Sequence, residues 1–268
     1  MHINPSRIAV LSFACAAALG LSMQASASRV HVRGGHQGAG QASHFRGTRF
    51  TGPNGGTLGH GERTVRDRQE HTLSRGRATR VTGPDGGTIA HGSKTVRDSD
   101  AGTLTRSHGT KATGPNGTTL THGGKTVYGP DGAVTHNGGT QVNGANGGSA
   151  TGNNTYTKNP DGSSEFTHTT SGTTANGTDF SHSKDVSKTA DGDRTASKQT
   201  TVTGANGGSL DTSKTSGGGT MTRNTEATTK SGSTYTGETT YTKGQGVTHT
   251  GTCTDANGNT ITCPQKHQ

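Results

Sequence analysis

Short runs of threonine and aliphatic residues alternate with glycine-rich turns along most of the chain. Residues 119–142 read TLTHGGKTVYGPDGAVTHNGGTQV, and close variants of this pattern recur before and after them. Threonine and valine are frequent in β-strands, whereas Pro, Asn, Asp and Gly are frequent in the turns between strands. The pattern therefore predicts a chain of β-hairpins.

The turn glycines define the repeat. From Gly117 to Gly207 they lie fifteen residues apart, and Gly55, Gly86 and Gly117 lie thirty-one residues apart. Each of these glycines follows Asn or Asp, which is preceded in turn by Pro or Ala. A fixed period of this kind is typical of repeat architectures.

The sequence also predicts a second turn within each unit. His-Gly-x-Lys/Arg-Thr-Val occurs three times, and glycine at the first place of a two-residue loop suits a type II′ hairpin turn. Loops at 123–124, 129–132 and 137–139 would pair Leu120 with Val127, Val127 with Val134, and Val134 with Val142. The same arithmetic pairs Leu58 with Val65 and Ile89 with Val96. About one aliphatic residue per strand would then form a single stripe on one face.

These patterns predict a β-rich repeat fold, either a hairpin meander or a solenoid-like stack, in a single layer with extensive disordered flanks. Hydrophobic residues make up only 23% of the chain, Gly accounts for 46 of 268 residues, and Trp is absent. Two buried Leu or Val side chains contribute roughly 1.5–3 kcal/mol each, whereas ordering a fifteen-residue unit costs about 20 kcal/mol. A second ribbon, a solenoid turn, another copy or a partner surface would therefore have to cover the stripe.

Five segments are expected along the chain. Residues 1–27 resemble a secretory signal peptide, because Arg7 precedes an apolar run and Ala25-Ser26-Ala27 is a small-residue cleavage site. The alternative of a membrane-spanning helix is weaker, because the apolar run is shorter than the roughly 20 residues that such a helix needs. A lipid anchor on Cys15 is weaker still, because the sequence before it is a poor site for lipid attachment. Residues 28–48 are predicted to be a disordered basic segment, 49–210 the β-hairpin repeat region, 211–250 a Thr/Gly/Ser-rich linker, and 251–268 a terminal hairpin with its tail. The mature chain is expected to be secreted, periplasmic or at the cell surface, without a transmembrane span.

Two cysteines, Cys253 and Cys263, remain in the mature chain. An even pair in an oxidising compartment favours a disulfide. A hairpin centred on Gly258 would place the two cysteines opposite each other, within disulfide range. Metal ligation is the weaker alternative because the chain has no second cysteine pair.

The charge is unevenly distributed. Residues 29–112 carry 12 Arg and 2 Lys against 6 acidic residues, a net charge of +8, while residues 113–268 carry 11 basic and 11 acidic residues. The basic half is expected to contact an anionic cell-envelope or polysaccharide surface. The candidate contact residues are Arg63, Arg66, Arg68, Arg75, Arg77 and Arg80. The alternative is a solvated basic segment that only aids solubility.

Histidine is the main candidate for site chemistry. His60, His91 and His122 lie thirty-one residues apart at equivalent positions, so a stacked repeat could align them as a ladder for a divalent metal ion. Alternatively, each histidine is an exposed neighbour of the cation at position 63, 94 or 125. The composition offers no desolvated pocket of the kind that acid–base catalysis needs, so no enzyme activity, cofactor or small-molecule substrate is expected.

The GPNG, GPDG and GANGG units after a signal peptide resemble secreted Gly/Thr-rich repeat proteins of proteobacteria. The resemblance covers roughly residues 50–210 and implies no activity. DANGNTIT at 255–262 is similar in style to the tyrosine–aspartate repeats of bacterial surface proteins, although their regular tyrosine is missing. The expected role is structural or adhesive, and the two alternatives are a histidine-ladder metal binder and a self-assembling β-fibre component.

Overall fold

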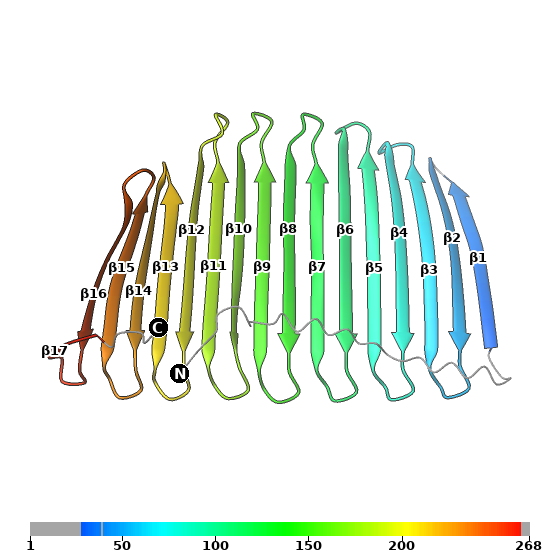
Figure 1. The fold of residues 1–268 in the computed structure, drawn as a ribbon. Coiled ribbons are helices and arrows are strands. Elements are labelled where there is room, and N and C mark those ends of the chain that lie inside the picture. Colours follow the sequence, from blue (N-terminus) through cyan, green and yellow to red (C-terminus); the bar gives the residue numbers. More distant parts are fainter. Residues whose placement is uncertain (1–27, 39, 264–268) are drawn as a thin grey trace.

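The computed structural model describes residues 28–38 and 40–263, which form one open antiparallel sheet of 17 strands without helices. Figure 1 shows the strands side by side in one layer. The strands are β1 (Ser28–Gly38), β2 (Gln41–Thr51), β3 (Thr57–Asp67), β4 (Thr72–Thr82), β5 (Thr88–Asp98), β6 (Thr103–Thr113), β7 (Thr119–Tyr128), β8 (Val134–Asn143), β9 (Ser149–Lys158), β10 (Ser164–Thr173), β11 (Asp179–Lys188), β12 (Arg194–Thr203), β13 (Ser209–Gly217), β14 (Thr220–Thr228), β15 (Thr234–Thr242), β16 (Gly246–Thr254) and β17 (Thr260–Ile261).

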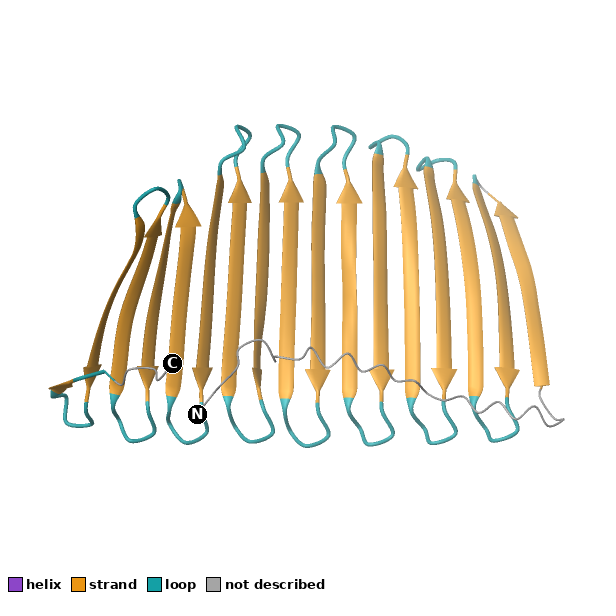
Figure 2. Cartoon of the chain, in the orientation of Figure 1, coloured by secondary structure: helices purple, strands orange, loops and turns teal. Residues whose placement is uncertain are grey.

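Each strand pairs only with its neighbours in the sequence, so the fold is a continuous hairpin meander. The turns lie along the two edges of the sheet, as Figure 2 shows. The predicted β-rich, single-layer repeat is confirmed, and of the two arrangements expected from the sequence the chain adopts the meander. The predicted signal peptide at 1–27 lies outside the described residues.

The Asn/Asp-Gly turns have the geometry that their sequence predicts. In the first of them Gly52 N donates a hydrogen bond to Gly56 O at 2.8 Å, and Gly55 N donates one to Gly52 O at 3.2 Å. Gly55 has a φ of 81°, a left-handed conformation that glycine adopts without steric cost. The equivalent glycines of the later units, from Gly86 to Gly207, also have positive φ.

The second turn predicted within each unit is wrong. Gly123 and Gly124 lie inside β7, and neither has the positive φ that a hairpin turn needs. Leu120 faces Ala112 and Val142 on the adjacent strands instead of Val127. A unit of fifteen residues therefore holds one strand of about ten residues and one turn of about five, rather than two short strands.

Strands also occupy both segments that were predicted to be disordered or a linker. In the first segment residues 28–38 belong to β1 and residues 41–48 to β2, and the second segment contains most of β13, all of β14 and β15, and part of β16. The fifteen-residue spacing of the turns is lost after residue 210, because the strands shorten to nine residues and the turn after β13 consists of residues 218–219 alone. Backbone hydrogen bonds to the neighbouring strand order these segments, and amino-acid composition alone does not indicate such bonds.

Directly opposed residues of an antiparallel sheet project from the same face, so the pairing sorts the side chains into two faces. We call one the histidine face, defined by His31, His60, His91, His122 and His182. It also carries a row with one apolar residue on most strands, comprising Phe50, Leu58, Val81, Ile89, Ala112, Leu120, Val142, Ala150, Phe180, Val202, Leu210, Ala227, Tyr235, Cys253 and Ile261. The other is the threonine face, defined by a row that includes Thr57, Thr82, Thr88, Thr113 and Thr119.

The sheet has almost no interior. Among the described residues Cys253 alone is buried, with 6% of its surface exposed, while Leu58 and Ile89 of the apolar row are 43% and 41% exposed. One aliphatic stripe on one face was predicted, and it forms with different partners. The chain satisfies its backbone through pairing and leaves both faces open.

A disulfide closes the C-terminal end of the sheet. It joins Cys253 to Cys263 with a Cα–Cα distance of 5.2 Å. Cys253 pairs with Ile261 in the ladder, so Cys263 lies two residues beyond the directly opposite position. The hairpin turns at Asp255–Asn259, where Gly258 has a φ of 84°.

Candidate functional site

Histidine and threonine alternate along a row that crosses the N-terminal half of the histidine face. The pairing aligns them as His31, Thr48, His60, Thr79, His91, Thr110, His122 and Thr140. Each histidine Nδ1 forms a hydrogen bond with the threonine Oγ1 on the next strand, at 2.8–3.1 Å. The three predicted histidines therefore share one row and have one common partner type.

The spacing of this row separates the imidazoles. His60, His91 and His122 lie on β3, β5 and β7, with a threonine strand between each pair. Strands lie about 4.8 Å apart, so consecutive histidines of the row are about 9.6 Å apart. Within residues 28–38 and 40–263, no group of three or more His, Cys, Asp or Glu side chains is placed to hold a metal ion. The lysine or arginine expected beside each histidine lies instead on the opposite face.

A row of small residues crosses the threonine face. It comprises Gly47, Gly61, Ala78, Gly92, Gly109, Gly123 and Gly139 on β2–β8. A methyl group placed on Gly61, Gly92 or Gly109 would meet neighbouring atoms only at 3.7–3.8 Å, an ordinary contact. The backbone does not require glycine at these three positions, so their effect is to leave the surface open. We call this row the glycine row.

Cations flank the glycine row on both sides. Arg49, Arg80 and Lys111 lie two residues away along their strands in one direction, and Arg63, Lys94 and Lys125 lie two residues away in the other. All six side chains are exposed. The two lines are four residues apart along the strands, or about 13 Å. Together with the glycine row they form what we call the cationic groove.

The groove is shallow and lacks acidic residues on its two flanking lines. Two connected hollows of about 850 and 1070 Å³ lie over it, and both are lined by Gly47, Ala78, Gly92 and Gly109. Asp67 and Asp98 are the acidic residues of this face on β2–β7, and they lie at the strand ends near one edge. The groove can therefore attract an anionic chain by charge while offering no enclosed space for a small molecule.

The six arginines predicted from the sequence do not gather at one place. Arg63 and Arg80 line the cationic groove. Arg66, Arg75 and Arg77 lie on the histidine face, and Arg68 lies in the turn after β3. Sequence reasoning missed Arg49, Lys94, Lys111 and Lys125, although the thirty-one-residue spacing of 49, 80 and 111 and of 63, 94 and 125 was the available signal.

One acidic side chain lies among the arginines of the histidine face. Glu62 Oε2 accepts a hydrogen bond from Arg46 Nε at 2.8 Å, and Glu62 Oε1 lies 3.0 Å from Arg77 Nε. The hydrogen bond from Arg46, together with the charges of Arg46, Arg77 and Arg75, lowers the pKa of Glu62 below its usual value of 4.5. Glu62 thus neutralises part of the positive charge of the arginines around it on the histidine face.

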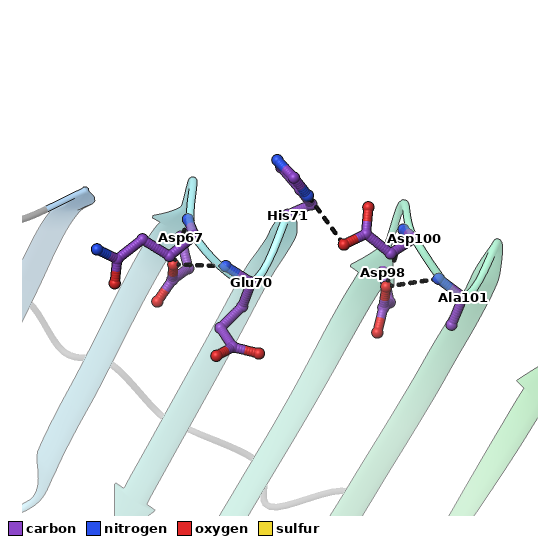
Figure 3. A network of polar contacts seen from close by, with 7 residues as sticks. Asp67, Glu70, His71, Asp98, Asp100 and Ala101 are labelled. Carbon is purple, nitrogen blue, oxygen red and sulfur yellow. Dashed lines mark hydrogen bonds and ion pairs between the residues drawn. The ribbon is translucent and has the colours of Figure 1, made fainter.

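The turns at the edge opposite the GPNG turns are joined by a side-chain contact. Asp67 and Asp98 each accept two backbone hydrogen bonds within their own turns, and His71 Nδ1 lies 2.9 Å from Asp100 Oδ2 of the next turn (Figure 3). The hydrogen bond and charge of Asp100 raise the pKa of His71 above 6.5. His71 has a φ of 43°, the conformation that Gly102 adopts in the next turn.

The fold and the faces define a class of protein, an open single-layer antiparallel β-meander with a cationic groove. Searches against protein families, curated proteins and solved structures give no match to this chain. Among the described residues, no helix is long and apolar enough to span a membrane.

Proposed function

We propose that this chain is a non-enzymatic structural or adhesive protein of the cell exterior, exported by its N-terminal segment. Its Arg-rich N-terminal half binds an anionic polymer or surface of the cell envelope. The cationic groove carries this proposal, because six exposed cations flank an open floor over six consecutive strands. Solvent-exposed charges act over a Debye length of about 8 Å at physiological ionic strength, so the binding depends on salt.

The first experiment compares the full chain with R49Q/R80Q/K111Q, using polygalacturonate and vesicles that contain phosphatidylserine as probes. We expect the variant to lose about tenfold in affinity at low salt. The matched control is R66Q/R68Q/R97Q, which removes the same charge outside the groove. Equal losses in the two variants, or binding that does not change with salt, would contradict the groove as the contact site.

The second experiment fills the groove floor without changing any charge. Valine at Gly61, Gly92 and Gly109 fits a strand well, and a Cβ there meets no close neighbour. We expect G61V/G92V/G109V to keep its β-sheet circular dichroism and to bind the polymer more weakly. Unchanged affinity in this variant would show that the polymer does not approach the glycine row.

Self-association is the second candidate, and the charge of the threonine face favours it. Acidic residues occupy this face on β10–β15, at Glu165, Asp179, Asp185, Asp211, Glu226 and Glu238. In a twofold pair of copies placed face to face, the acidic zone of each copy would cover the cationic groove of the other. Sedimentation should then show a dimer at low salt that dissociates at high salt, and a monomer at every concentration would rule the dimer out.

A further inference from the structure

The net charge of zero in residues 113–268 conceals a separation of charge between the two faces of β9–β16. On β9–β16 every Lys and Arg within a strand lies on the histidine face: Lys158, Lys184, Lys188, Arg194, Lys198, Lys214 and Arg223. Every Asp and Glu within these strands lies on the threonine face. The alternation of side chains along each strand converts a neutral sequence into one cationic and one anionic face.

Four of these cations form a continuous line. Lys184 faces Lys198 across β11 and β12, Lys198 faces Lys214 across β12 and β13, and Lys214 faces Arg223 across β13 and β14. All four side chains are exposed. We call this line the lysine row. Directly opposed residues lie about 4.5–5.5 Å apart at Cα, so the row is about 14 Å long at the strand spacing of about 4.8 Å.

Like charges placed directly opposite each other destabilise a sheet. The row repeats this unfavourable arrangement three times, and no carboxylate of β9–β16 lies on the same face to offset it. A chain that is otherwise rich in neutral Thr and Ser could place those residues here at no such cost. Binding of an anion along the row is the arrangement that would relieve the repulsion.

The flanks of the row are neutral and differ from each other. His182, Thr200, Thr212 and Thr225 lie on one side, where hydroxyl groups can form hydrogen bonds. Val186, Ala196, Ser216 and Met221 lie on the other. At one end Lys184 Nζ lies 5.8 Å from the centre of the Phe166 ring. A hydroxyl-bearing chain that lies along the row could therefore contact charge, hydroxyl groups and apolar surface together.

We propose that the lysine row binds a linear acidic polysaccharide that lies across β11–β14 and presents one anionic group to each cation. Polyuronates carry one carboxylate per sugar, at a step close to the strand spacing, together with hydroxyl groups. A membrane presents its headgroups in two dimensions, which suits cations spread over a face better than cations in single file. This site lies in the half of the chain, and on the face, that the cationic groove does not use.

His182 provides a local probe of the row. Partial burial lowers its pKa below 6.5, and the charges of Lys198, His168 and Lys184 lower it further. An anion bound along the row would neutralise the nearby lysines. The pKa of His182 would then rise on binding, a change that general attraction to distant parts of the protein would not produce.

The experiment uses the full chain carrying R49Q/R80Q/K111Q, so that binding in the cationic groove is already weakened. Oligogalacturonates of increasing length are titrated by calorimetry. We expect affinity to rise with length until four carboxylates are present, one for each cation of the row, and then to level off. K198Q/K214Q should lower the affinity about tenfold.

The matched control is K230Q/K243Q, which removes the same charge from two turns. Three results would overturn the proposal: an equal loss in the control, a His182 pKa that does not rise on binding, or tighter binding to phosphatidylserine vesicles than to the oligosaccharide that also depends on the row. The groove proposal is tested in turn in the K198Q/K214Q background, with the cationic groove intact, so either site can fail without the other.

Discussion

His60 Nδ1 and Thr79 Oγ1 form a 2.9 Å hydrogen bond between adjacent strands, and the same contact joins His91 to Thr110 two strands further on. A threonine separates each pair of histidines along the row and holds the Nδ1 atom of one of them, and the described residues hold no group of three or more potential metal ligands. We therefore expect H60Q/H91Q/H122Q to bind Zn²⁺ as the unmodified chain does. Loss of micromolar Zn²⁺ binding in the variant, measured by calorimetry, would revive the histidine-ladder function.

Glu62 should make the stability of the sheet sensitive to acid. Its folded pKa lies below 4.5 because Arg46 donates to it, so the unfolded chain binds the proton more readily. The stabilisation is present above pH 4.5 and is lost as the pH falls through the lower folded pKa. Urea unfolding at a series of pH values should show this loss in the unmodified chain, while E62Q should show a smaller one. An identical acid dependence in E62Q would contradict this role.

The contact between His71 and Asp100 predicts the opposite pH dependence. The pKa of His71 is raised above 6.5, so its contribution to stability is present below pH 6.5 and is lost as the pH rises through the folded pKa. Replacing Asp100 with Asn should return the His71 pKa toward its ordinary value, as measured by NMR titration. A raised His71 pKa in D100N would assign the shift to another group, such as Asp98.

Replacing Lys198 should stabilise the fold even as it weakens binding. Lys198 faces two other lysines, so K198Q removes two directly opposed like-charge pairs, which destabilise a sheet. We expect a higher urea midpoint for K198Q at low salt and a smaller gain at high salt. K230Q serves as the control, and an equal gain there would indicate general charge repulsion instead.

The disulfide should hold the C-terminal end of the sheet together. β17 is only two residues long, and Cys253 is the most enclosed residue of the described chain. A disulfide that closes a short loop typically contributes about 2–4 kcal/mol. C253S/C263S should expose β16 to proteolysis while β3–β12 stay protected, as measured by limited digestion and mass spectrometry. Digestion that spreads at once through all strands would contradict this local effect.

The turn sequences predict most of the fold, and one misread glycine pair explains most of the error. Pro-Asn/Asp-Gly sequences strongly favour a reversal of the chain. The hairpins, and the single apolar stripe that follows from them, could therefore be predicted. Gly123 and Gly124 were interpreted as a turn because glycine favours both turns and open strand positions. The extra turn changed the pairing of Leu120 and placed His122 and Lys125 on the same face.

The candidate sites depended on that pairing. Side chains alternate between the two faces along an uninterrupted strand of about ten residues. The resulting pairing places Arg63 and Arg77 on opposite faces, and it places Lys184, Lys198 and Lys214 on the same face. The net charge of each half of the chain does not reveal this distribution, because it adds together the charges on the two faces of the sheet. Composition predicts a disordered segment at 28–48 and a linker at 211–250, because it does not take account of the backbone partner that each new strand finds at the edge of the previous one.

Because each strand contacts only its adjacent strands, the chain could gain or lose whole hairpins during evolution. Losing or duplicating one hairpin would shorten or extend the sheet by about 9.6 Å without disturbing a packed interior. The span of the sheet could then change by whole hairpins, with the change falling among the interchangeable units before the disulfide-closed hairpin.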